Sequence, residues 1–557
     1  MEGNWASALG HICARWARVL LWGWAKCRRR HRASLSPKIM SAAGPAMPKR
    51  CEGYVACGSC AVDSRVQGVR YFLCKPRFIV RTLLNPVRAL LEQVGRVLAR
   101  LGWIDAQRGD AIAELAWPRI VTGVARMSKA TADVAMVGLA VGAAGIAGIG
   151  YGVPYWTLAY MLGGGIAGGT ISVVSQRFGA GEHPGITTAV VQSAALGLLT
   201  TLPLVALFTG IPEPLIRLIG SGEAAVAHGV TYLSIASWAM PFAALNLVGS
   251  RALVGANEAW IPMVIRAGGA IANVILSGVL IFVFDMGVAG AALGTVLGGA
   301  SVTGVLAWGF VRGRLPYVGA LPIQWDARAT LGDRATAQRL VQVGTPLALR
   351  KVAQGGGRFP MMAIVAFFGP NVVAAYVVAL RMRGLMNTPG WGFGLASSSL
   401  VGQALGRNDD SEAEAYGHDT LRFTVTVYAL VALAIFVGAR PVSYLFVQDP
   451  ELIPTTVALL RATCVSVIFH GLLNGALGPL RAGGDTTWPF YGQLAGLFLF
   501  ALPLAYAGAV TPLGLWGVYL ALVFETAIPA FVTYYRYHSG AWLAINRAYR
   551  AATRGSA

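Results

Sequence analysis

The feature that most constrains this chain is a series of apolar stretches that recurs from about Ile112 to Tyr537. Each has about 20 residues or more, and a helix of that length crosses the ~30 Å hydrocarbon layer of a bilayer at ~1.5 Å per residue. Hydrophobic residues make up 55% of the chain and charged residues only 12%, about half the charged share of a soluble domain. The sequence therefore predicts an all-α integral membrane protein. Twelve spans are expected, at 111–139, 145–177, 184–210, 226–252, 259–284, 287–311, 336–367, 371–404, 414–438, 453–479, 487–509 and 513–536.

The net charge of +21 is concentrated at the N-terminus. Residues 1–112 hold 19 Lys or Arg and 6 Asp or Glu, a net charge of +13. No finger motif and no interleaving of basic and aromatic residues accompanies this charge. We therefore expect a basic cytoplasmic flank beside anionic lipid and no nucleic-acid partner.

Residues 1–80 form a basic, cysteine-containing extension. We expect this extension to be disordered or to lie upstream of the true start of the transporter. Four of its cysteines could form a zinc site, although only one pair has CxxC spacing; they are Cys51, Cys57, Cys60 and Cys74. Its apolar run Val19–Ala25 is too short to span a membrane and lacks a cleavage site, so no signal peptide is expected.

Residues 81–110 carry the pattern of an interfacial amphipathic helix. Arg88, Arg96 and Arg100 lie away from one apolar face. That face consists of Leu90, Leu91, Val94, Val97, Leu98 and Leu101.

The chain repeats itself at a shift of 227 residues. Marks on several spans and loops coincide at this shift, among them Gly142 with Gly369, Gln176 with Gln403, Gly179 with Gly406 and Pro262 with Pro489. Each copy has six crossings, an even number, so the two copies share one orientation and form two lobes around a central cleft. The predicted parts are an N-lobe at 111–311, a linker at 312–335, a C-lobe at 336–537 and a cytoplasmic tail at 538–557.

Arginines set the expected orientation of the spans. If the basic N-terminus is cytoplasmic, the outer loops hold only Arg217 and Arg440, and the other loop arginines lie inside. Both termini are then predicted to be cytoplasmic.

Four motifs resemble the MATE (multidrug and toxic compound extrusion) family and, with the repeat, cover about 110–537. They are TADVAMVG at 131–138, SQRFGAG at 175–181 echoed by GQALGRN at 402–408, the loops RALVGANEAWIP at 251–262 and RAGGDTTWP at 481–489, and GVAGAALGT at 287–295. The resemblance implies a secondary transporter of the MOP superfamily and not an enzyme.

Asp133 is a carboxylate well inside the first span, where a charge is costly unless it pairs or faces water. Lys129 lies one helical turn before Asp133, and Arg126 lies two turns before it. Asp133 therefore either binds the coupling ion or belongs to a structural ion pair.

Within the family the chain resembles the DinF-like and archaeal branch, and this resemblance implies a cation site between the first, fifth and sixth spans. Asn273, Thr295 and the carbonyl of Ala291 match this site, and Ser277 stands where those members carry an aspartate. With Asp133 these residues supply the oxygen ligands that hard cations prefer. The missing carboxylate leaves both Na+ and H+ open as the coupling ion.

Other candidates concern the substrate cleft and helix bending. The second span offers aromatic surface for an organic cation, from Tyr151, Tyr155, Trp156 and Tyr160. Arg381 and Glu525 are charged residues of the C-lobe, and Glu525 is expected to pair with one of the nearby bases, with a structural role left open. Pro118 and Pro389 are expected to let the first and eighth spans bend.

The sequence thus predicts a proton- or sodium-coupled antiporter that exports organic, cationic or amphipathic compounds by alternating access. A flippase for a lipid-linked precursor is the alternative. We expect a monomer in the plasma membrane, with the bilayer and a small organic substrate as its partners and no cofactor beyond the coupling ion.

Overall fold

The computed structural model describes residues 85–555 except 221, 317, 324, 325, 327–332, 445 and 447–449. These residues belong to one structural unit, Val69–Ala557. The predictions for residues 1–80, including the zinc alternative at Cys51, Cys57, Cys60 and Cys74, lie outside the described residues.

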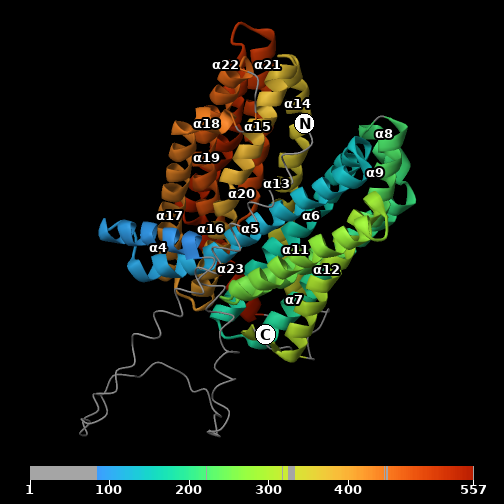
Figure 1. Ribbon diagram of the computed structural model, residues 1–557. Coiled ribbons are helices and arrows are strands. Elements are labelled where there is room, and N and C mark those ends of the chain that lie inside the picture. Colours follow the sequence, from blue (N-terminus) through green and yellow to red (C-terminus); the bar gives the residue numbers. More distant parts are fainter. Residues whose placement is uncertain are drawn as a thin grey trace, which may run out of the picture. The chain divides into compact units, whose positions relative to one another are not determined.

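The first half of the unit is entirely helical, and Figure 1 shows it in blue to green. A short amphipathic helix precedes the long apolar ones. The helices are α4 (Asn85–Arg100), α5 (Ala106–Val141), α6 (Ala143–Gly179), α7 (His183–Gly210), α8 (Pro212–Ile219), α9 (Glu223–Ala236), α10 (Ala239–Gly255), α11 (Trp260–Phe282) and α12 (Gly287–Arg312).

The second half, in yellow to red in Figure 1, is built in the same way. Its helices are α13 (Arg334–Gly356), α14 (Arg358–Ala366), α15 (Pro370–Met386), α16 (Thr388–Gly406), α17 (Asp410–Val437), α18 (Ala439–Tyr444), α19 (Leu452–Gly483), α20 (Thr487–Leu494), the π-helical η1 (Ala495–Ala501), α21 (Leu502–Val510), α22 (Leu515–His538) and α23 (Ala541–Gly555).

Eight helices of the described part are long and apolar enough to cross a membrane, and α9 with α10, bent by 47°, makes a ninth. The three remaining predicted spans coincide with α5, with α13 and α14, and with α15 and α16. These helices carry bases such as Arg126, Arg350 and Arg383, which lower their mean hydropathy. Charges inside a span mark a face turned to the protein or to a cavity rather than to lipid.

Four predicted spans are not single α-helices. The fourth breaks between α9 and α10, the seventh at Gly357 and the eighth at Asn387, and the eleventh contains the π-helical turn η1. Breaks and π-bulges leave backbone groups free, and in membranes they occur where protein or a cavity can satisfy those groups.

The linker and the tail contain regular structure that the sequence analysis did not predict. In the linker, β1 (Arg314–Leu315) pairs antiparallel with β2 (Gly319–Ala320) after a left-handed turn at Gly313. The tail is helix α23, whose Trp542 is buried and stacks on Tyr537 at 6.1 Å. This packing onto α22 explains why the segment is a helix and not an extended tail.

Helix α4 confirms the helix that was predicted near the start of the unit, but its apolar residues do not share one environment. Leu91 and Leu98 are buried against the bundle, whereas Leu90 is 61% exposed and Val97 48% exposed. Only part of the predicted apolar face is therefore free to meet lipid.

Matching residues of the two repeats hold the halves together. Gly179 at the end of α6 lies against the backbone of Gln403 on α16, and Gly406 on α16 lies against the backbone of Gln176. The side chain of Gln176 also donates to the carbonyl of Ala482, and Ser399 donates to that of Val254 at 2.6 Å. The loop residues singled out by the repeat thus serve the packing between halves.

A capped helix start adds a further tie across the halves. Asp333 accepts a hydrogen bond from the backbone N–H of Thr336 at 3.1 Å and caps α13, and Arg177 of α6 lies 3.5 Å from its carboxylate. Burial raises the pKa of the Asp333 carboxyl, but the Thr336 hydrogen bonds and the Arg177 charge outweigh it, so the pKa lies below its ordinary value.

Candidate functional site

A strip of charge on α5 lies at the centre of the first half. Lys129 and Asp133 stand one helical turn apart, and Lys129 Nζ lies 2.9 Å from Asp133 Oδ2. Their side chains are 23% and 14% exposed. Because both side chains are largely shielded from solvent, either charge would be costly without its partner.

The five residues expected to form a cation site are brought together around this pair. Lys129 Nζ donates to Thr295 Oγ1 at 3.2 Å, and Thr295 Oγ1 donates to the Ala291 carbonyl at 3.1 Å. Asn273 Nδ2 approaches Thr295 Oγ1 at 3.5 Å. Ser277 is buried close to Asp133 on the facing helix.

Three oxygens of this cluster remain unsatisfied. Asp133 Oδ1, Asn273 Oδ1 and Ser277 Oγ are buried without a hydrogen-bond partner among the described residues. Buried polar atoms are nearly always partnered, by protein, water or an ion. These three oxygens can therefore accept a small cation or a proton. The Lys129 ammonium already donates to Asp133 Oδ2 and Thr295 Oγ1.

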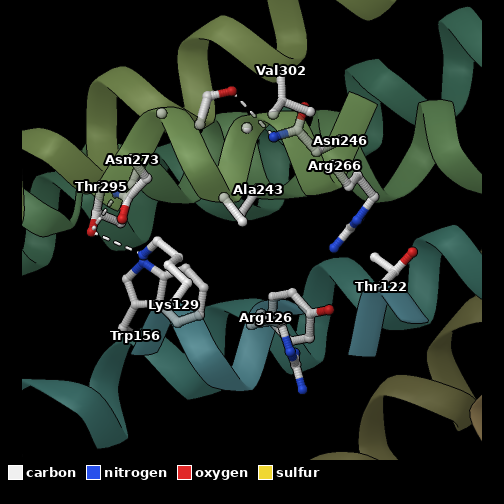
Figure 2. Close-up of a pocket in the computed structure, with 16 residues that line it drawn as sticks. Thr122, Arg126, Lys129, Trp156, Ala243, Asn246, Arg266, Asn273, Thr295 and Val302 are labelled. Carbon is white, nitrogen blue, oxygen red and sulfur yellow. Dashed lines mark hydrogen bonds between the residues drawn. The ribbon is translucent and has the colours of Figure 1, made fainter. Parts of the chain in front are cut away.

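A cavity of ≈ 160 Å³ adjoins this cluster. Figure 2 shows it between α5 and α6 on one side and α10, α11 and α12 on the other. Its polar and aromatic lining residues are Thr122, Arg126, Lys129, Trp156, Tyr160, Asn246, Arg266, Asn273 and Thr295. Among the described residues, the lining contains three bases and no acid.

Two of the aromatic residues chosen from the sequence lie elsewhere. Tyr155 donates its hydroxyl to the Leu215 carbonyl and packs edge-on against Phe208 at 5.5 Å, and Tyr151 lies against Gly220. The other two aromatic residues chosen from the sequence, Trp156 and Tyr160, line the cavity and stack at 5.6 Å. Sequence alone did not reveal which side of α6 faces the cavity.

Arg126 connects the cavity with the second half. Its guanidinium lies 5.1 Å from the ring centroid of Tyr160 and 4.9 Å from that of Trp391 on α16. The same base therefore contacts one aromatic ring from each half, and movement of the halves relative to one another would change its surroundings.

In the second half Glu525 pairs with Arg383, at 2.6 Å between Oε2 and Nη1, and both side chains are 7% exposed. The expected pairing of Glu525 with a nearby base is thus confirmed. Arg381 is exposed on α15, and neither Arg381 nor Glu525 lines the cavity described above.

The two prolines occupy different positions. Pro118 lies inside the continuous helix α5, and Pro389 lies in the first turn of α16, where a missing N–H costs no hydrogen bond. The discontinuity of the eighth span is at Asn387. A bending role for either proline remains a prediction.

Sequence reasoning missed Arg266 on α11. Figure 2 shows its side chain reaching across the cavity toward Thr122 of α5. A base in the middle of an apolar span is itself a signal of a functional site, and this signal was present at position 266.

The comparisons with known proteins agree with this arrangement. The family model MatE matches residues 118–279 and 346–507. The second match begins 228 residues after the first, which confirms the internal repeat predicted at a shift of 227.

Two relatives and one solved structure illustrate the similarity. The chain is 25% identical to the probable multidrug resistance protein NorM of Bradyrhizobium diazoefficiens, over 75% of this chain and 90% of the relative. It is 26% identical to the multidrug resistance protein PmpM of Pseudomonas aeruginosa, over 72% and 86%. A structure described as the outward-facing conformation of a multidrug resistance MATE family transporter of the MOP superfamily has a TM-score of 0.71, 21% identity and coverage of 79% and 96%.

The assignment to the DinF-like branch stays a prediction. The family matches cover more than half of the chain and fall on both six-span halves. The chain therefore belongs to the MatE family and is a membrane transporter with two six-helix repeats, not an enzyme.

Proposed function

We propose that this chain is a proton-coupled antiporter that exports organic compounds by alternating access. The observation that carries the proposal is the Asp133–Lys129 pair, held within the first half and in contact with Thr295 beside a cavity. The relatives named as multidrug resistance proteins support the class of substrate.

The position of Lys129 favours H+ over Na+ as the coupling ion. The ammonium donates to Asp133 and Thr295, two of the residues that a sodium ion would need. A proton needs only the Asp133 carboxylate.

Alternating access would use the contact between the repeats. Gln176, Gln403 and the glycines beside them close the halves against each other at the ends of α6 and α16, the side that the arginine distribution places in the cytoplasm. Opening this contact while the opposite side closes would change the side of the membrane to which the cavity is open.

The proposal also covers the cellular location, the oligomeric state and the cofactor. We propose a plasma-membrane location with both termini in the cytoplasm, a monomer as the functional unit and no cofactor. An inward-moving proton contributes ~2.3 kcal/mol for each 100 mV of membrane potential, besides the pH gradient.

The proposal is tested by efflux from proteoliposomes under a pH gradient or a sodium gradient imposed separately, with an anionic and a cationic fluorescent dye. We expect efflux under the pH gradient alone and its loss in Asp133→Asn. The control is Asp285→Asn, the same change at an exposed loop aspartate, which should transport as the wild type does. Efflux driven only by sodium would refute proton coupling, and no efflux of either dye would refute export of such compounds.

A further inference from the structure

The cavity of the first half carries an excess of positive charge. Of its three bases, Lys129 is neutralised by Asp133, which leaves Arg126 and Arg266. Arg126 lies between two aromatic rings. Among the described residues Arg266 has no hydrogen-bond or ion-pair partner, and its Nη1 is fully buried.

Two further guanidinium groups lie near Arg266 but do not belong to the cavity lining. Arg119 Nε and Arg251 Nη1 are also buried without partners in the described part of the chain. Both groups are close enough to Arg266 and to Tyr160 to interact with them electrostatically. Four bases from α5, α10 and α11 thus lie close together, two of them in the cavity lining, and no carboxylate of the described residues compensates them.

Such a cluster repels a cationic substrate and attracts an anionic one. Buried charges are stable when they are paired, and removal of one partner from a pair in a protein interior is strongly destabilising. The second half shows the satisfied arrangement, because Arg383 there has Glu525. In the first half no such acid faces Arg266 among the described residues, so an anion from outside would complete the arrangement.

We infer that this cavity binds the anionic group of an amphipathic organic substrate, with Arg266 as its principal ligand. The guanidinium presents paired N–H donors that match a carboxylate, sulfonate or phosphate. The stacked rings of Trp156 and Tyr160 form an apolar wall for the remainder of the molecule. This inference rests on the proposed function and replaces the cationic substrate expected from the sequence.

The site lies next to the proposed coupling site, and Lys129 is common to both. An antiporter binds its proton and its substrate in alternation, so the anion is bound to Arg266 while Asp133 is ionised and holds the Lys129 ammonium. Binding of the anion therefore depends on Arg266, and its exchange for a proton depends on Asp133.

The test is equilibrium binding of two pyrene dyes, pyrenebutyrate and a pyrenebutyl trimethylammonium, to the purified full-length protein in nanodiscs of phosphatidylcholine. The dyes share an apolar ring and differ in the sign of charge. We expect wild type to bind the carboxylate at least about tenfold more tightly than the ammonium. Arg266→Gln should remove this preference and Arg266→Lys should retain part of it.

The matched control is Arg461→Gln, an exposed arginine of α19 outside the cavity, which should bind as wild type does. Equal binding of the two dyes, or tighter binding of the ammonium, in the wild type would overturn the inference. Because binding is measured without a gradient, this result is separate from whether protons drive transport.

A second arm distinguishes the source of the anion. Nanodiscs that contain phosphatidylglycerol supply a lipid phosphate that competes for the same guanidinium. If phosphatidylglycerol abolishes the part of dye binding that requires Arg266, the result supports the site and identifies a lipid headgroup as an occupant. Unchanged dye binding supports the site and assigns it to free organic anions.

Discussion

Gly179 at the end of α6 lies against the main chain of Gln403 on α16, so closely that an added Cβ would stand 2.1 Å from the Gln403 carbonyl oxygen. The equivalent residues of the repeat make the reciprocal contact, with Gly406 against the Gln176 carbonyl at 2.0 Å. The two halves therefore close on each other through the same pair of residues used twice.

This contact predicts that Gly179→Val and Gly406→Val hold the halves apart. A side chain at either position meets main-chain atoms that cannot rotate away, and overpacking of this kind costs about 1–3 kcal/mol. Thermal unfolding in detergent should show the loss, and transport should fall with it. Gly304→Val is the control because no atom of the described residues lies within 4 Å of its added Cβ. An equal loss of stability in Gly304→Val would contradict the prediction.

The buried pair Arg383–Glu525 predicts a large loss of stability in Glu525→Gln. Removal of one partner leaves a guanidinium uncompensated in a membrane interior, which costs about 3–5 kcal/mol. Both residues belong to the second half and lie outside the cavity, so transport per folded molecule should change little.

A second variant makes that prediction sharper. Arg383→Met combined with Glu525→Leu removes both charges and should recover most of the stability, because replacement of a buried pair by apolar residues is often neutral. The measurement is the midpoint of thermal unfolding for the two variants side by side. A double variant less stable than Glu525→Gln would show that the pair does more than balance charge.

The position of Lys129 predicts that Lys129→Met creates a sodium site. Without the ammonium, Asp133, Thr295 and the unsatisfied oxygens of Asn273 and Ser277 become free to bind a hard cation. At a sodium concentration of about ten times Kd the variant should gain about 1.4 kcal/mol of stability relative to choline. Lys351→Met, a base of the second half, should gain nothing, and equal sodium stabilisation of the wild type would contradict the role given to Lys129.

The sequence predicted the repeat and the span count because these depend on periodic apolar residues and on motifs at fixed spacing. The candidate ion site came from the family resemblance, and its role as an ion site stays a prediction. The sequence did not predict the contact between Lys129 and Thr295, which are 166 residues apart and meet only when α5 packs beside α12. It also did not separate the aromatic residues that line the cavity from those that do not, since Tyr155 and Trp156 were both candidates and only Trp156 lines it. An apolar helix has too small a polarity difference between its sides for the sequence to reveal which one faces the cavity.

The helix breaks were missed for a related reason. Asn387 and Gly357 interrupt spans that are long and apolar enough as a whole to be taken for continuous helices. Local signals were present at both breaks, with a run of glycines that ends at Gly357 and Pro389 two residues after Asn387. The buried bases Arg119, Arg251 and Arg266 were visible in the sequence, but only the structure shows that they gather without an acid.

If the substrate is an anion, each transport cycle moves net charge across the membrane, and this charge movement can be measured. Export of a monoanion in exchange for one inward proton moves two positive charges inward per cycle. An inside-negative potential of 100 mV therefore adds about 4.6 kcal/mol of driving force. This free energy could sustain a roughly 10³-fold concentration gradient of the anion. Export of a monocation for one proton moves no net charge. We therefore expect pyrenebutyrate efflux from proteoliposomes, with the lumen standing for the cytoplasm, to accelerate when valinomycin and a potassium gradient make the lumen negative. In Arg266→Gln the residual efflux should be slow at either potential, and efflux that is indifferent to potential in the wild type would argue for an electroneutral exchange instead.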